Sequence, residues 1–548
     1  MTFSLRSRAL AAIVSVCSIA VLATGCGTGN TGIDTSEAST NQMITANITE
    51  PSNGLLPGNT SDMSGWKIVS QLYDGLVTFD TKGNEELVQA KSITPNTDAS
   101  GYTIKLKPSL KFSNGEKITA STYARSWSFA ANAANAANGQ VGASIFEDIK
   151  GYDDLQDANG DKNAQLSGLD VVDDSTLKVT LKEPNSAFAY KLGDIAFLPV
   201  PSQALKDPKT YGLKPVGNGP YKLKEWKSGE EIVLERDKNY KGPRKVKNAG
   251  IDFKVYQSLD AAYSDLLAGN LDTLDSIPTS ALKTYRDEKN ITAISKDGPS
   301  FSDLTIPQNL KHFQGKEGVL RRRAIAHALD RESIAKAIFD GTVTPAADFL
   351  APVIKGYDPK LGADALSYNK DKAKKLWSQA DAISPWDGTF RIAYSADGTD
   401  KEWAEAAANS LGNVLDIKAE SYPFATSKEL RSAIQDRTIG AAFKSGMSSD
   451  YPHPEGYLVQ AYDSASADGK GLNNGDYKSA RFDALINQAA KQTDLDKAIG
   501  IYQESEKVLI EDLPVIPLWY TNVTAACAKG VHVDYNYMGV PEYNTVTK

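Results

Sequence analysis

Helix-like and strand-like patterns alternate along almost the whole of this chain, and this mixture is what most restricts its fold. In 102–107 apolar and polar residues alternate, as they do in a half-buried strand. In 318–340 apolar residues recur at helical spacing, in a stripe that is expected to break near Asp330. Because both patterns occur throughout, the sequence predicts an α/β or α+β fold.

Other segments carry the same two signals. Strands are expected over 44–48, 176–181 and 515–520, together with a hairpin that joins 221–226 to 231–236. Helices are expected over 66–75, 119–132, 259–268, 402–411, 428–436, 477–491 and 494–509. The sequence has no regular internal repeat, so it does not predict a repeat architecture.

The length and charge of the chain narrow its class. With 548 residues it is too long for a single hydrophobic core, which indicates two or three domains. Its 41% apolar and 23% charged residues argue against a disordered chain and against a protein with several membrane spans. Lys and Arg number 60 against 68 Asp and Glu, a formal net charge of -8. Nucleic acid needs a basic surface, so it is not expected to be the main partner.

The first 25 residues have the features of a secretory signal peptide. Arg6 and Arg8 precede an uncharged run over 9–21, and small residues lie directly before Cys26. A run of this length is too short to cross a bilayer as a helix. The residues before Cys26 resemble a bacterial lipobox, which implies a lipoprotein signal peptide over 1–25 and lipidation of Cys26. The alternatives are a plain secreted protein cut nearby and a buried cysteine.

The segment after Cys26 is rich in Gly, Thr, Ser and Asn, so residues 26–42 are expected to form a flexible tether. Residues 27–32 fit the pattern G-x-G-x-x-G, but no strand precedes them and no helix follows, so a dinucleotide site is rejected. Removal of the signal peptide leaves only Cys26 and Cys527. Lipidation of Cys26 excludes an internal disulfide, and Cys527 is expected to be a small core residue.

The sequence contains no motif that points to catalysis or to a bound metal ion. The four His are scattered, and neither a G-x-S-x-G elbow nor a G-x-x-x-x-G-K-[ST] loop is present. The acidic loop 157–161 resembles a calcium loop, but Lys162 and Gly168 stand where such a loop needs Gly and Glu. We therefore predict no catalytic residue, no metal and no cofactor. A glycosidase pair among the many carboxylates stays open, because the sequence does not give their separation.

Six sequence blocks, spread over the chain, are similar to those of one known family. They are 71–77, 102–129, 218–226 with 239–240, 319–331, 446–454 and 513–518. For example, 218–226 is similar to the family pattern "GpYklkew", and 446–454 to "GW-aDYpdP". Together the blocks resemble the extracytoplasmic solute-binding proteins of peptide ABC importers, the oligopeptide- and dipeptide-binding family (solute-binding family 5). They occur in family order over nearly the whole mature chain.

The resemblance implies an α/β, periplasmic-binding-protein-like fold. This is a two-lobe clamshell with an extra inserted domain, and ligand is buried between the lobes. The implied domains are a discontinuous lobe I over 43–77, 190–290 and 506–548, the extra domain over 78–189, and lobe II over 291–505.

The implied ligand site centres on the block 446–454. Asp450 matches the family Asp that pairs with the amino terminus of a peptide, and a turn or helix-capping role is the alternative. The backbone of Gly446 and Ser448 would hydrogen-bond to the ligand. Met447 stands where the family commonly has Trp, which implies a more adaptable pocket beside the first ligand residue.

Three further positions belong to this expectation. His453, between two prolines and where an acid is frequent in the family, either lines the site or caps a turn. Near the start of the chain, Pro51 and Ser52 lie where family members often contact ligand through their backbone. The residue that pairs with a ligand carboxylate varies within the family and is not assigned.

The resemblance implies a lipid-anchored substrate-binding protein on the extracytoplasmic face of the cell membrane. It would capture short peptides as a monomer and deliver them to an ABC permease in the membrane, without being an enzyme. One alternative keeps the fold but binds another solute, such as an oligosaccharide, an opine-like compound or a metal chelate. A second alternative, from a different class, is an exported hydrolase.

Overall fold

The computed structural model describes residues 41–138 and 143–548. The predicted signal peptide, Cys26 and the predicted tether up to residue 40 lie outside the described residues. Within the described ranges, no helix combines the length and the apolar character that a membrane crossing needs.

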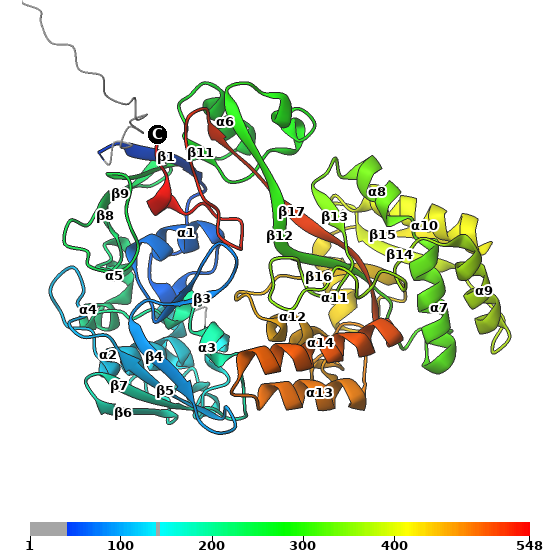
Figure 1. Ribbon diagram of the computed structural model, residues 1–548, viewed down its shortest axis with the longest axis horizontal. Helices are drawn as coiled ribbons and strands as arrows, with labels where there is room; N and C mark the ends of the chain where they lie inside the picture. The colour runs from blue at the N-terminus through cyan, green and yellow to red at the C-terminus, as the bar shows by residue number, and fades with distance from the viewer. Residues whose placement is uncertain (1–40, 139–142) are drawn as a thin grey trace, which may run out of the picture. The chain divides into compact units, whose positions relative to one another are not determined.

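The central element of the fold is one large mixed sheet, which extends through both halves of the molecule (Figure 1). In the described residues, eleven strands form it. In spatial order they are β15 (Ala419–Phe424), β14 (Phe390–Ser395), β16 (Ala442–Met447), β12 (Ile291–Thr305), β17 (Val515–Ala528), β11 (Thr273–Leu274), β1 (Met43–Ile48), β10 (Gly250–Val255), β9 (Glu231–Arg236) and β8 (Tyr221–Lys227), with β13 (Val343–Pro345) also paired to β17. The predicted first strand and hairpin are confirmed as β1, β8 and β9.

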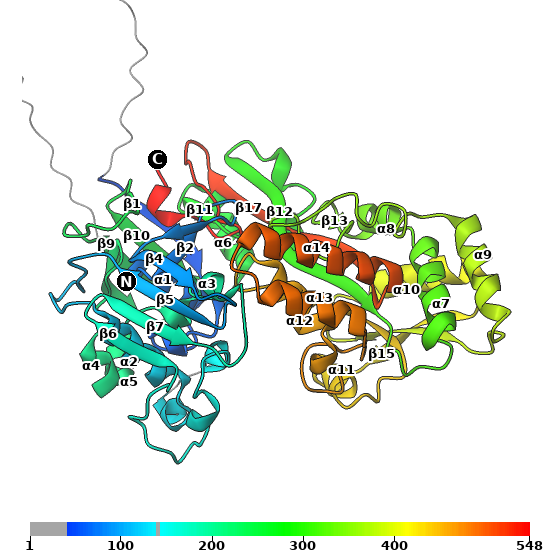
Figure 2. The ribbon, with the colours of Figure 1, turned by 60° about the horizontal axis from the view of Figure 1, so that its bottom comes forward.

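Two long strands, β12 and β17, connect the halves. They pair antiparallel over most of their length, and Figures 1 and 2 show them running side by side from one half to the other. The predicted strand 515–520 is the first part of β17, which continues to Ala528. The continuation has no apolar pattern, because the side chains of 521–524 are exposed or only half-buried. Cys527 is 2% exposed and packs with Ile44, which confirms its predicted place in the core.

We call residues 41–138, 143–290 and 529–548 the first half. Residues 306–514 are the second half. In the first half, α1 (Met63–Leu72) packs on the large sheet, where Val69 and Ile251 share one core. The helix begins earlier than its predicted start at residue 66, because Asp62 caps it by accepting a hydrogen bond from the Gly65 N–H at 2.9 Å. The helices α4 (Ser202–Lys206) and α5 (Pro208–Leu213) contribute to the same core, whereas α6 (Leu259–Leu267) packs against β11 and β17 in a separate one.

A four-stranded antiparallel sheet builds a second core in the first half. Its order is β4 (Ala90–Pro95), β5 (Gly101–Leu106), β7 (Thr176–Thr180) and β6 (Leu169–Asp173), and the pair β2 (Val77–Phe79) and β3 (Glu85–Leu87), α2 (Ala120–Ala131) and α3 (Phe188–Lys191) lie in the same region. Trp127 of α2 is fully buried, and its indole N–H donates to the Phe197 carbonyl at 2.8 Å. The predicted strands 102–107 and 176–181 and the helix 119–132 are confirmed here.

Helices surround the other end of the large sheet in the second half (Figure 2). They are α7 (Gly315–Ala328), α8 (Arg331–Ile338), α9 (Lys370–Asp381), α10 (Lys401–Leu415), α11 (Ser427–Gln435), α12 (Pro454–Tyr462), α13 (Ala480–Ala490) and α14 (Leu495–Asp512). The predicted break near Asp330 is confirmed, because α7 ends at Ala328 and Asp330 caps α8 by accepting from the Ser333 N–H at 3.0 Å. The four helices predicted after residue 400 are confirmed as α10, α11, α13 and α14, with shifted ends.

Candidate functional site

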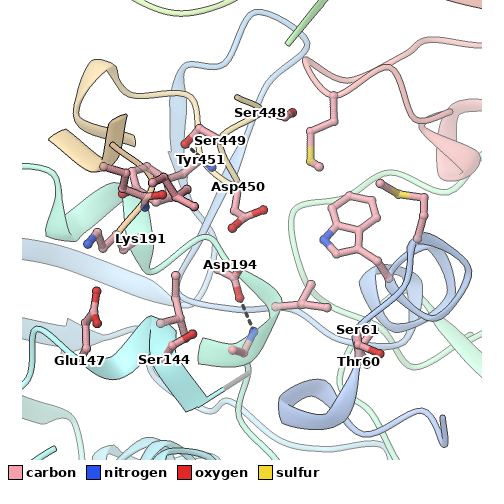
Figure 3. Close-up of a pocket in the computed structure, with 18 of the residues that line it drawn as sticks. Thr60, Ser61, Ser144, Glu147, Lys191, Asp194, Ser448, Ser449, Asp450 and Tyr451 are labelled. Carbon is pink, nitrogen blue, oxygen red and sulfur yellow. Dashed lines mark hydrogen bonds between the residues drawn. The ribbon is translucent and has the colours of Figure 1, made fainter. Parts of the chain in front are cut away.

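A cavity of about 660 Å³ lies between the two halves. The first half contributes side chains from 57–66, 144–147 and 191–196, and also Met538, while the second half contributes side chains from 448–472. Figure 3 shows how these segments face one another across the cavity. Sites for small ligands usually enclose about 300–1,000 Å³. Because it has a suitable size and needs both halves, this cavity is the candidate functional site.

Asp450 extends from the second half into this cavity (Figure 3). It follows β16 in a bend, and its backbone carbonyl accepts a hydrogen bond from the Tyr537 hydroxyl at 2.9 Å. Its carboxylate meets solvent in the cavity, but protein surrounds it on most sides, and this desolvation raises the pKa of Asp450 above its ordinary value. The structure thus places Asp450, which is predicted to pair with a ligand ammonium, in a cavity. Leaving its carboxylate without a partner there costs energy.

The strand before Asp450 has an edge without a partner. β16 pairs with β12 along 443–447, but with β14 only at Ala442 and Phe443. Among the described strands, 444–447 therefore keeps one backbone edge unpaired. Gly446 allows β16 to approach β12 closely, because a Cβ atom there would lie 2.5 Å from the Phe301 carbonyl oxygen. An exposed edge of this kind can pair with an extended peptide.

The other residues predicted in 446–454 have different positions. Ser448 lines the cavity with Asp450, whereas Gly446 and Met447 line a smaller cavity of about 60 Å³ on the second half. His453 is fully buried and caps α12, where its Nδ1 accepts from the Glu455 N–H at 3.1 Å. Burial, with Lys191 and Lys355 nearby, lowers the pKa of His453 to about 3, so its ring is neutral. It is not among the residues that line the large cavity.

Pro51 and Ser52 follow β1 and approach the site only indirectly. Pro51 is buried and Ser52 is exposed, and neither lines the large cavity. The Ser52 N–H donates to the carboxylate of Asp62 at 3.0 Å, and Asp62 does line it. Direct ligand contact by Pro51, Ser52, Gly446, Met447 or His453 stays a prediction.

Sequence reasoning missed Asp194, which lines the cavity from the first half (Figure 3). It caps η5 (Ile195–Phe197) by accepting from the Ala196 N–H at 2.7 Å. Burial, together with the negative charge of Asp450, raises the pKa of Asp194 to about 6. The one signal in the sequence is that Asp194 interrupts the largely apolar stretch 187–200.

Lys191 joins the two halves beside the cavity. Its ammonium lies 2.6 Å from Asp148 of the first half and 3.6 Å from Glu455 of the second half. The Tyr451 hydroxyl also donates to the carboxylate of Glu455. Burial alone would lower the pKa of Lys191, but Glu455 and Asp148 outweigh it and raise the pKa. Lys191 is therefore a charged and already paired cation in the wall of the site.

Lys470 is a second cation in the wall, and it belongs to the second half. Its side chain is exposed, and it forms no ion pair with any residue in the described ranges. The neighbouring residues Gly471 and Leu472 line both this cavity and an adjoining one of about 510 Å³. The site therefore offers an unpaired positive charge near a second space into which a longer ligand can extend.

The described part of the chain contains no group of three or more His, Cys, Asp or Glu placed to hold a metal ion. The chemistry that this cavity offers is the binding of charged and hydrogen-bonding groups. Carboxylates of Asp194 and Asp450 can accept from a cation, Lys470 can donate to an anion, and the edge of β16 can pair with a backbone.

Comparison with protein families shows which family the chain belongs to. The family model of the bacterial extracellular solute-binding proteins, family 5, matches residues 87–469. The chain belongs to this family. The match includes β12, β16 and Asp450, and the resemblance inferred from the six sequence blocks is confirmed.

Two curated relatives illustrate the similarity. The dipeptide-binding protein DppE of Bacillus subtilis is 25% identical over 468 residues, which cover 83% of this chain and 82% of the relative. The oligopeptide-binding protein OppA of the same organism is 24% identical over 514 residues, which cover 90% of this chain and 90% of the relative. Both alignments extend over most of this solute-binding protein.

A solved structure shows the same fold. The periplasmic murein tripeptide-binding protein MppA, in its unliganded open form, gives a TM-score of 0.81 at 19% identity, over 93% of this chain and 98% of that chain. The predicted α/β fold, a two-lobed architecture of the periplasmic binding-protein type, is confirmed.

Proposed function

We propose that this solute-binding protein captures short peptides in the cavity around Asp450 and delivers them to an ABC importer. The observation that carries the proposal is an unpaired carboxylate in a cavity of about 660 Å³ between two halves. Relatives named as dipeptide- and oligopeptide-binding proteins support a peptide as the ligand. The role is binding and delivery by a monomer, without catalysis.

The chemistry of the cavity suits the groups that all peptides share. Asp450 would hold the ligand ammonium by a charge-assisted hydrogen bond. The unpaired edge of β16, with Ser448 after it, would pair with the peptide backbone without reading side chains. Ligand side chains would then occupy hydrated space, such as the adjoining cavity at Leu472.

Closure of the halves on the ligand would signal occupancy to the importer. A ligand in this cavity touches both halves, so it binds more strongly when they approach each other. Domain closure of this kind is a common device among binding proteins. The strands β12 and β17 are the connections about which the halves would move.

The location and the domain boundaries are also part of the proposal. The lipobox-like sequence supports lipidation of Cys26 and attachment to the extracytoplasmic face of the membrane, near the permease. The residues 1–40 that carry this inference are outside the described ranges. The predicted division into lobe I, the extra domain 78–189 and lobe II stays a prediction.

Native mass spectrometry of the soluble protein that starts at Gly27 tests the peptide proposal. Binding proteins with enclosed sites retain ligand during purification, so we expect a spread of added masses that resolve into short peptides on denaturation. A single sugar or metal-chelate mass would contradict the proposal. So would a protein that is purified empty and stays empty when challenged with a mixture of short peptides.

Substitution of Lys470 tests its suggested part in the site. If its unpaired ammonium binds the ligand carboxylate, Lys470→Met should weaken the binding of free-acid peptides by roughly twofold to fivefold, the scale of an exposed ion pair. Peptides with an amidated carboxyl end should bind the variant and the original protein alike. Titration calorimetry measures both, and an equal loss for acid and amide would assign Lys470 another role.

A further inference from the structure

Two cavities meet at a junction made of four residues. Trp66, Asp194, Ile195 and Asp450 line both the cavity of about 660 Å³ and a neighbouring cavity of about 100 Å³. Asp194 and Asp450 are the charged members of this set. Figure 3 shows them on opposite walls, with Asp194 from the first half and Asp450 from the second.

The two carboxylates lack a cation partner in the described part of the chain. Lys191 lines the larger of these cavities and Arg244 the smaller. Both are already paired, Lys191 with Asp148 at 2.6 Å and Arg244 with Asp74 at 2.7 Å. The burial of Asp194, together with the negative charge of Asp450, raises the pKa of Asp194. The junction is therefore a place where a positive charge from outside the protein would be stabilised.

We propose that this junction is a cage for a primary ammonium group, in which Asp194 acts as a second carboxylate opposite Asp450. An ammonium has three donors, so it can form charge-assisted hydrogen bonds with both carboxylates at once. Trp66 adds an aromatic ring to the same junction, and aromatic faces attract cations. The inference rests on the proposed function in one respect, because that function identifies the bound ammonium as the amino terminus of a peptide.

The cage links recognition of the amine to closure of the protein. Asp194 and Asp450 belong to different halves, so their approach without a cation brings two negative charges together. A bound ammonium removes this repulsion and attracts both walls. Ligands with a free amine should therefore favour closure more than ligands of the same shape whose amine is blocked.

Asp194→Asn tests the cage without removing the helix cap. The amide oxygen of Asn can still accept from the Ala196 N–H, while the charge is lost. In titration calorimetry at pH 7.5 we expect the variant to bind trialanine at least about tenfold more weakly, and N-acetyl-trialanine with less than about a twofold change. The matched control is Asp207→Asn, an exposed cap of α5 outside the cavity that accepts from the Thr210 N–H at 3.2 Å. It should change neither affinity.

The pH profile gives a readout that a merely structural role would not change. Because the pKa of Asp194 is about 6 in the free protein and a bound ammonium favours its ionised form, binding should release a proton. Trialanine affinity should then rise by up to about tenfold per unit between pH 5 and 6 and level off towards pH 7, with a smaller rise in Asp194→Asn. The other charged groups around the junction are Asp62, Glu147, Lys191 and Lys470 in the large cavity and Asp74, Arg244 and Glu542 in the small one.

The outcomes separate the cage from the peptide proposal. If Asp194→Asn weakens both peptides equally, weakens neither, or keeps the original pH slope, the cage is wrong while peptide binding stands. If the original protein binds no peptide, the peptide proposal is wrong. The binding of alanine amide, which has an α-ammonium but no carboxylate, then tests the cage. Binding of alanine amide that is lost in Asp194→Asn supports the cage, and absent or unchanged binding overturns it.

Discussion

Replacement of Asp450 by alanine is expected to weaken the binding of free-amine peptides by about 2–5 kcal/mol, which is roughly 30-fold to several thousand-fold. The loss arises because the ligand ammonium is desolvated in the closed cavity without its main partner. The low end of this range is more appropriate here, since the Asp450 carboxylate meets solvent in the cavity and Asp194 remains on the opposite wall. Titration calorimetry with trialanine, or with a peptide that the protein retains on purification, measures the effect.

Peptides whose amine is acetylated provide the control for this result. They carry no ammonium, so Asp450→Ala should change their affinity little. Equal losses for free and acetylated peptides would mean that Asp450 shapes the cavity and does not bind the amine. The double variant with Asp194→Asn adds a coupling test, because two carboxylates that share one ammonium should give non-additive losses.

Replacement of Lys191 by methionine should cause the largest loss of stability among the site residues. The Lys191 side chain is only 8% exposed, and its removal leaves Asp148 and Glu455 close together without their shared cation. Removal of one partner from a buried ion pair typically costs about 3–5 kcal/mol. A lower midpoint of thermal unfolding in differential scanning calorimetry is the expected result, and the midpoint is the proper measure because a protein of several domains need not unfold in two states.

A second lysine supplies the control for this prediction. Lys182 pairs with Asp153 at 3.1 Å, but their side chains are 36% and 74% exposed, so Lys182→Met should move the midpoint little. Adding Glu455→Gln to Lys191→Met should restore part of the lost stability, because one of the unpaired buried charges is removed. A midpoint that is unchanged in Lys191→Met would show that this network does not hold the halves together.

Several helices and strands could be predicted because the causes of local structure lie close together in the sequence. Alternation in 102–107 and the helical stripe in 318–340 reflect which side of an element is buried, and β5, α7 and α8 follow them. Asp330 marks the break between α7 and α8 because a cap acts on the next turn of the chain. Where a strand crosses between the halves its pattern weakens, and the sequence therefore predicted only the first part of β17.

Asp450 could be singled out for the same reason, since a short run of residues around it carries the family pattern. By itself, the sequence indicated the mixed α/β class and the family, and it singled out Asp450 and Ser448, which both line the cavity, as candidates for the site. Only the tertiary structure decided what surrounds Asp450. Asp194 and Trp66 lie far from it along the chain, and they meet it only because β12 and β17 bring the two halves together. A cavity and its charges arise from such long-range contacts, and neither periodicity nor motif spacing reports them.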